Sequence, residues 1–193
     1  MQAMARQPVV LIVGDSLSAE YGLRRGSGWV ALLEQRLTDQ KMPARVVNAS
    51  ISGDTTSGGR SRLPALLRTH QPDVVVIELG GNDALRGLPL DMTRDNLRAM
   101  VRASQQAGAR VLLVGMEMPP NYGIRYAEDF RQLFVDVSRS EKVPLVPFFL
   151  KGVADGPDPV ALFQPDRIHP NETAQPIMLE NVWPRLRDLL PKG

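Results

Sequence analysis

The stretch Val9-Val10-Leu11-Ile12-Val13-Gly14-Asp15-Ser16 places five aliphatic residues directly before a glycine, an aspartate and a serine. A short, uninterrupted aliphatic run rich in β-branched residues is typical of a parallel strand that is buried on both faces. Comparable runs, each bounded by Gly, Pro, Asn or Asp, recur at residues 45–47, 74–79, 111–114 and 143–146. We therefore predict five parallel strands.

The segments between these runs carry apolar residues at helical spacing. Trp29, Val30, Leu33 and Leu37 recur at intervals of about 3.6 residues, which predicts an amphipathic helix over residues 29–37. Similar patterns predict helices within residues 63–67, 92–107, 127–137 and 173–190, the last with prolines 176 and 184 as points of interruption. Strands that alternate with helices indicate an α/β/α sandwich with right-handed crossovers.

Composition limits the class of protein. A chain of 193 residues fits one domain, 1–193 with a core of about 8–190, and 43% apolar with 23% charged residues is ordinary for a soluble fold. The 23 basic and 21 acidic residues are scattered, so we expect no nucleic-acid partner. The absence of cysteine excludes disulfides and thiolate nucleophiles. No apolar run approaches the roughly 18 residues of an integral membrane segment. Residues 1–7 hold no apolar stretch, so we expect no signal peptide in the chain as given.

Ser16 follows the first predicted strand directly. In open parallel sheets the ligand binds outside the carboxyl ends of the strands, so this hydroxyl lies at the expected edge. We expect residues 17–19 to open a helix, whose N-terminus would favour negative charge that develops near Ser16. The alternative is a serine that only caps this helix.

A serine nucleophile needs a base, and the chain contains two histidines. His70 precedes the third predicted strand and therefore lies at the wrong edge of the sheet. His169 follows the last strand, and Asp166 is near enough in a turn to accept a hydrogen bond from its Nδ1. A surface histidine beside a turn carboxylate is the alternative.

Acyl transfer also needs neutral donors where the oxyanion forms. Asn82 follows a predicted strand and two glycines, and Gly53 offers a backbone N–H that no side chain shields. Taken separately, both are ordinary turn residues. Together with Ser16 and His169 they make up a nucleophile, a base and an oxyanion hole.

Four motifs contain these residues: GDSLS at 14–18, NASISGDT at 48–55, ELGGND at 78–83 and DRIHPN at 166–171. In this order they resemble the SGNH, or GDSL-type, hydrolases, and most closely the bacterial group of multifunctional acyl-CoA thioesterases, arylesterases and lysophospholipases. The resemblance extends from about residue 9 to residue 184.

The resemblance implies a flavodoxin-like sheet with strand order 2-1-3-4-5. It also implies the catalytic triad Ser16, His169 and Asp166, and an oxyanion hole made by the N–H groups of Ser16 and Gly53 and the side chain of Asn82. It implies no metal and no organic cofactor. The expected location is periplasmic if a signal peptide has been removed, and cytoplasmic otherwise.

The expected substrate is a small acyl ester or acyl thioester, which is hydrolysed. The alternatives are an acyltransferase of the same fold and a small-ligand-binding domain without catalysis. We expect an apolar groove for the acyl chain, although its residues could instead pack inward; they are Leu85, Leu88, Met116 and Met118.

Glu20 departs from the family pattern, which has a small residue at this position. It is either a solvated helix residue or a negative charge at the pocket mouth that disfavours anionic substrates such as acyl-CoA.

Overall fold

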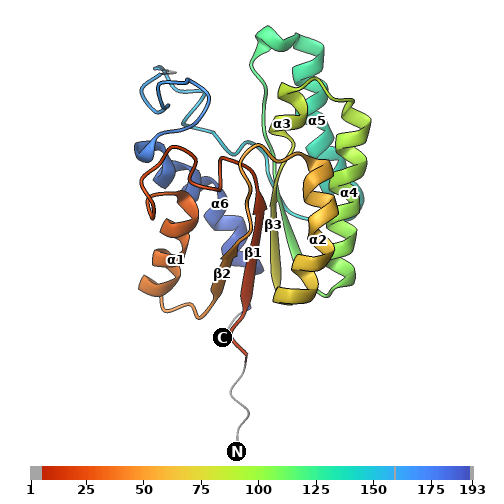
Figure 1. The fold of residues 1–193 in the computed structure, drawn as a ribbon, viewed down its shortest axis with the longest axis vertical. Coiled ribbons are helices and arrows are strands. Elements are labelled where there is room, and N and C mark those ends of the chain that lie inside the picture. The colour runs from red at the N-terminus through yellow and green to blue at the C-terminus, as the bar shows by residue number, and fades with distance from the viewer. Residues whose placement is uncertain (1–5, 159, 192–193) are drawn as a thin grey trace, which may run out of the picture.

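The computed structural model describes residues 6–158 and 160–191. Its centre is a five-stranded parallel sheet of order β2-β1-β3-β4-β5 (Figure 1). The predicted fold class and strand order are confirmed. The strands are β1 (Val9–Gly14), β2 (Arg45–Asn48), β3 (Val74–Glu78), β4 (Arg110–Val114) and β5 (Leu145–Val146).

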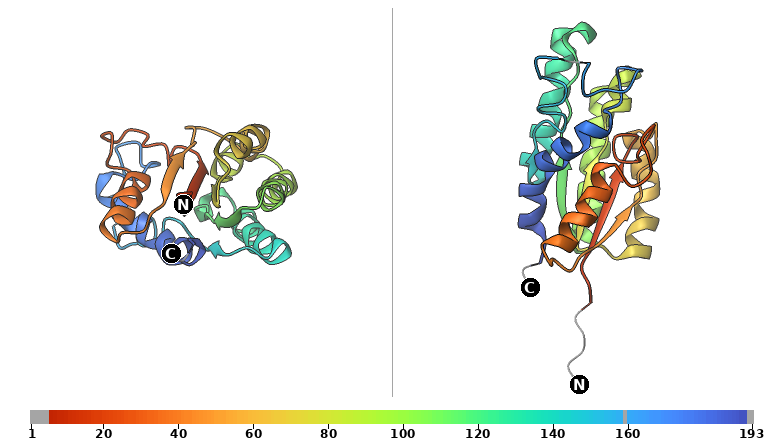
Figure 2. Two further views of the ribbon diagram at one scale, coloured as in Figure 1. Left: turned by 90° about the horizontal axis from the view of Figure 1, so that it is seen from below. Right: turned by 90° about the vertical axis from the view of Figure 1, so that its left-hand side faces the viewer.

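Helices cover both faces of the sheet, with α1 and α6 on one face and α2, α4 and α5 on the other (Figure 2). Both faces need a cover because successive side chains of a strand point to opposite faces of the sheet. In β1, Val10 and Ile12 pack in the core with α1 and α6, whereas Leu11 and Val13 pack in the core on the opposite face. The helices are α1 (Trp29–Asp39), α2 (Thr56–His70), α3 (Gly81–Leu85), α4 (Leu90–Gln106), α5 (Ile124–Glu141) and α6 (Gln175–Leu189), with 3-10 turns at η1 (Pro120–Tyr122) and η2 (Glu172–Ala174).

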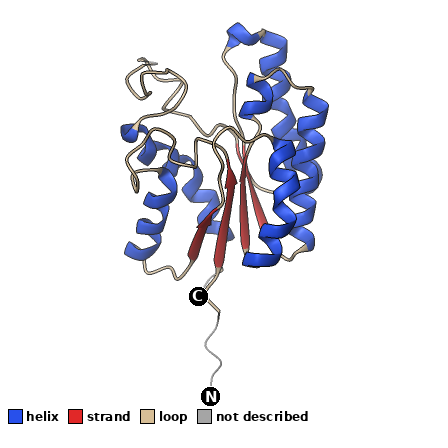
Figure 3. Cartoon of the chain, viewed as in Figure 1, coloured by secondary structure: helices blue, strands red, loops and turns tan. Residues whose placement is uncertain are grey.

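The register of the central strands brings the functional loops together. Gly14 at the end of β1 pairs with Glu78 at the end of β3, so the segments that follow both strands leave the sheet side by side. The loops from these strand ends gather at one edge of the sheet (Figure 3). Among the described residues, no helix combines the length and apolar character that crossing a bilayer requires.

The helix expected at residues 17–19 was a wrong prediction. The N–H groups of Ser18 and Ala19 both bond to the carbonyl of Asp15, but residues 16–22 form only turns, and the first helix begins at Trp29. Glu20 has a φ of +59° and Gly22 a φ of +69°. A right-handed helix cannot continue through left-handed backbone.

Helix α2 differs from the expectation in where it begins, and helix α6 in being continuous. Helix α2 begins at Thr56, earlier than the apolar pattern indicated, because the Thr55 side chain accepts a bond from the Gly58 N–H and caps the helix. Helix α6 runs without interruption from Gln175. Pro176 lies in its first turn, where no N–H donor is required, and buried neighbours hold the helix around Pro184.

Candidate active site

The structure brings Ser16, His169 and Asp166 into one hydrogen-bonded chain. His169 Nε2 lies 3.0 Å from Ser16 Oγ, and His169 Nδ1 lies 2.6 Å from Asp166 Oδ2. Ser16 follows β1, whereas the other two residues lie in the loop before η2. In this geometry His169 can take the proton of the serine hydroxyl.

A tight turn holds the carboxylate of Asp166 in place. Its Oδ1 accepts bonds from the N–H groups of Ile168 at 2.9 Å and His169 at 3.0 Å, and Arg167 has left-handed backbone with a φ of +59°. Partial burial by itself raises the pKa of Asp166. The hydrogen bonds from the His169 ring and the two N–H groups outweigh it and lower the pKa to about 2. Asp166 is therefore an ionised acceptor that favours the Nδ1–H form of His169.

Tyr21 packs against the imidazole, although the sequence did not single it out. The ring centroids of Tyr21 and His169 lie 4.4 Å apart. Gln164 connects both segments, because its Nε2 donates to the Tyr21 carbonyl at 2.8 Å and its N–H donates to the His169 carbonyl at 2.7 Å. The loop after Ser16 and the histidine loop thus support each other.

The surroundings of Glu20 differ from those that either interpretation of the sequence implied. It is not in a helix, and its carboxylate turns back onto its own loop. Its oxygens accept bonds from the N–H of Gly26 at 3.0 and 3.1 Å and from the N–H of Gly28 at 2.9 Å. Glu20 therefore closes the loop that carries Tyr21.

These hydrogen bonds predict that Glu20→Ala lowers the stability of the fold. Loss of the hydrogen bonds to the carboxylate should lower the free energy of unfolding by about 1–2 kcal/mol, which is a fall in Tm of roughly 2–8 °C for a chain of this size. Glu20→Gln keeps a carbonyl acceptor and should lose less. Thermal unfolding measures both, and a selective gain of Glu20→Ala in kcat/KM for acyl-CoA over a neutral ester would restore the pocket-mouth interpretation.

Gly53 and Ser16 present backbone N–H groups at the same edge. The Asp54 N–H bonds to the Ile51 carbonyl at 3.1 Å and closes a turn in which Gly53 has a φ of +80°, as a type II turn requires. Neither the Ser16 N–H nor the Gly53 N–H donates a hydrogen bond within the described part of the chain. Both are therefore available to an oxyanion.

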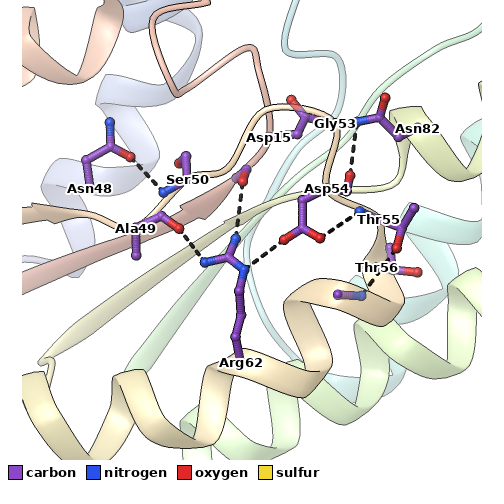
Figure 4. A network of polar contacts seen from close by, with 12 residues as sticks. Asp15, Asn48, Ala49, Ser50, Gly53, Asp54, Thr55, Thr56, Arg62 and Asn82 are labelled. Atoms are coloured by element: carbon purple, nitrogen blue, oxygen red, sulfur yellow. Dashed lines mark hydrogen bonds and ion pairs between the residues drawn. The ribbon is translucent and has the colours of Figure 1, made fainter.

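Asn82 is tied to this turn. It lies in α3, a helix the sequence reading did not anticipate, and its Nδ2 donates to the carbonyl of Asp54 at 2.9 Å (Figure 4). The same nitrogen lies 3.3 Å from Asp15 Oδ2, a longer contact. The structure thus brings Asn82 and the Gly53 turn together.

Two buried carboxyl groups lie beneath the site and were missed by the sequence reasoning. Burial raises the pKa of Asp15 to about 6, although the bond from the Leu17 N–H opposes it. Burial, together with repulsion from Asp15, raises the pKa of Glu78 well above its ordinary value. Ser18 donates to Glu78 at 2.6 Å and accepts from the Trp29 indole at 3.1 Å. An acidic residue that ends an aliphatic strand, as Glu78 does, was the available signal.

The four residues expected along the acyl chain have mixed surroundings. Leu85 ends α3 and is 45% exposed, and Leu88 is half-buried in the loop that follows. Met116 and Met118 are half-buried and pack partly against the core. Their contact with an acyl chain stays a prediction.

A Ser–His–Asp chain beside free backbone N–H groups, at the carboxyl edge of a parallel sheet, is an arrangement found in serine hydrolases. The sequence also shows to which family within this class the chain belongs. Residues 12–175 match the model of the GDSL-like Lipase/Acylhydrolase family, and the chain belongs to this family.

Individual relatives agree with this placement. Over 186 residues the chain is 52% identical to "Esterase TesA" of Pseudomonas aeruginosa, covering 96% of this chain and 91% of that one. It is 42% identical to "Thioesterase 1/protease 1/lysophospholipase L1" of Escherichia coli K12, covering 96% and 86%. The crystal structure of the psychrotrophic esterase EstA from Pseudoalteromonas sp., inhibited by monoethylphosphonate, superposes with a TM-score of 0.87 at 41% identity, covering 94% and 98%.

Proposed function

We propose that the protein is a carboxylic ester hydrolase with Ser16 as its nucleophile. The observation that carries this proposal is the chain from Ser16 Oγ through both ring nitrogens of His169 to the ionised Asp166. The names of the relatives as esterase and as thioesterase and lysophospholipase support acyl esters, and by extension acyl thioesters, as substrates.

The geometry supports a two-step reaction. Ser16 Oγ attacks the acyl carbonyl carbon while His169 Nε2 takes the hydroxyl proton, and Asp166 stabilises the imidazolium. The N–H groups of Ser16 and Gly53 donate to the oxyanion. The Asn82 amide keeps one N–H on the Asp54 carbonyl and turns the other from its 3.3 Å contact with Asp15 Oδ2 to the oxyanion. His169 then gives its proton to the leaving alcohol or thiol. Water attacks the acyl-enzyme in the same way and releases the acid.

The substrate class is tested with p-nitrophenyl esters and acyl-CoAs of increasing chain length. We expect hydrolysis of both kinds of acyl donor. A competing alcohol in the same assay separates hydrolysis from acyl transfer, because a transferase would form the new ester in place of the free acid. Absence of turnover with every acyl donor, together with tight binding of one of them, would support the non-catalytic alternative.

Asn82→Ala tests the oxyanion hole separately from the nucleophile. Its amide donates to charge that exists mainly in the transition state, so kcat should fall by about 10²–10³ while KM changes little. Asn82→Asp keeps the shape but removes the donor, and it should lose at least as much. Steady-state kinetics on a short ester measure both. An unchanged kcat with a several-fold higher KM would assign Asn82 to ground-state binding instead.

A further inference from the structure

Arg62 extends from α2 towards the carboxyl edge of the sheet, where one guanidinium group contacts three separate pieces of chain (Figure 4). Its Nε lies 2.7 Å from Asp54 Oδ2. Its Nη1 donates to the carbonyl of Ala49, and its Nη2 donates to the carbonyl of Gly14 at 3.4 Å. Arg62 therefore joins the end of β1 to both ends of the loop after β2.

The ion pair is largely enclosed. The side chains of Arg62 and Asp54 are 20% and 12% exposed, whereas those of the helix-surface pair Arg125 and Asp129 are 96% and 58% exposed. An enclosed charge is costly to leave unpaired, and such pairs are poor evidence for stability but can fix one geometry. The planar fork of arginine suits this role, because it binds several acceptors at once in fixed directions.

Two of the three contacts of Arg62, those with Gly14 and Asp54, lie close in the chain to a proposed oxyanion donor. Gly14 is two residues before Ser16, and its carbonyl also accepts the Ile51 N–H at 3.0 Å, which ties it to the turn of Gly53. Asp54 directly follows Gly53, and its Oδ1 accepts the Thr55 N–H at 2.9 Å. The carbonyl of Asp54 accepts the Asn82 amide at 2.9 Å.

We propose that Arg62 is a positioning residue that sets the geometry of the oxyanion hole by holding Asp54, Ala49 and Gly14 in one arrangement. This inference rests on the proposed function. Oxyanion donors act only when they lie about 2.7–3.1 Å from the developing charge, and a misplacement of about 1 Å can cost up to 10²-fold in rate. Arg62 affects the reaction through these donors and does not itself contact the substrate.

The test compares Arg62→Met and Arg62→Lys with the wild type on a short p-nitrophenyl ester. Arg62→Met should lower kcat by roughly 10–100-fold while KM stays within about threefold, because the misplaced donors bind mainly the transition state. Arg62→Lys should lose less but not recover fully, since an ammonium group lacks the fork. The pH dependence of kcat/KM should keep its shape, because Asp166 and His169 lie on a different loop.

Arg102→Met is the matched control. Arg102 pairs with Glu141 at 2.8 Å between α4 and α5, so this variant also breaks an arginine–carboxylate pair but leaves the site untouched. Its kcat should equal that of the wild type. In Arg62→Ala, millimolar methylguanidinium should restore part of kcat in a saturable way, and it should not raise kcat in Arg102→Met. If Arg62 contributed only to stability, kcat per folded molecule of Arg62→Ala would equal that of the wild type, and methylguanidinium would raise Tm without raising kcat.

A folded Arg62→Met enzyme with wild-type kcat would overturn the inference. If Arg62→Met does not fold, Asp54→Asn replaces it, because this isosteric change removes the charge and leaves one acceptor oxygen in place of the two that Arg62 Nε and the Thr55 N–H contact. Its kcat should fall with KM unchanged, and a folded Asp54→Asn enzyme with wild-type kcat would equally overturn the inference. Failure of the proposed function looks different, because Ser16→Ala would then retain hydrolysis whatever the Arg62 variants do.

Discussion

Ser16→Ala is expected to lower kcat for ester hydrolysis by about 10⁶, the scale on which serine hydrolases lose activity when the nucleophile is removed. The physical reason is that His169 Nε2, 3.0 Å from Ser16 Oγ, then has no hydroxyl to deprotonate. The oxyanion donors remain, so a rate of about 10³–10⁴ over water should persist. Steady-state kinetics on a p-nitrophenyl ester measure the loss.

Ser140→Ala is the matched control for this change. Ser140 lies near the end of α5, where its hydroxyl donates to the Val137 carbonyl of the same helix. Removal of this hydroxyl should leave kcat unchanged. Wild-type activity in Ser16→Ala would remove Ser16 from the mechanism and with it the proposed function.

Asp166→Asn is expected to lower kcat by up to about 10⁴. The asparagine amide can donate to His169 Nδ1, which favours the tautomer that carries its proton on Nε2. That tautomer cannot accept the Ser16 proton. Asp188→Asn, an exposed change at the end of α6, should leave kcat unchanged. A loss below tenfold in Asp166→Asn would show that His169 is held by other contacts, such as Tyr21.

The lowered pKa of Asp166 also predicts how the stability of the wild type and of Asp166→Asn depends on pH. The pKa of Asp166 is about 2 in the folded chain against an ordinary value of 3.8, so the folded state favours the ionised carboxylate. This contribution to stability is complete above about pH 4 and is lost as the pH falls towards 2. Thermal unfolding of the wild type from pH 5 to pH 2 should therefore show a steeper loss than that of Asp166→Asn. Equal slopes would contradict the lowered pKa.

Local patterns were sufficient to predict much of the fold. Aliphatic runs such as residues 9–13 can be buried only in the middle layer of a sandwich, and the helical spacing around Trp29 and Leu33 has one buried face. Residues 16–22 could not be predicted in this way. Their path depends on a left-handed Glu20 whose carboxylate is satisfied by N–H groups later in the same loop.

In the candidate site, too, some residues could be predicted from the sequence and others could not. Ser16, His169 and Asp166 could be proposed because each follows a predicted strand and because chemistry restricts which residue types can act together. Tyr21 and Arg62 could not be proposed, since neither has a local signal. Their roles depend on contacts with His169 and Asp54 that only the folded chain brings about.

The most direct test of the central claim is covalent labelling with a fluorophosphonate, followed by intact-mass measurement and peptide mapping. The reagent phosphonylates an activated serine oxygen with loss of fluoride. We predict one adduct per chain, located on Ser16, complete loss of esterase activity in step with labelling, and no adduct in Ser16→Ala. An adduct on another serine, or full esterase activity in protein labelled on Ser16, would contradict the account.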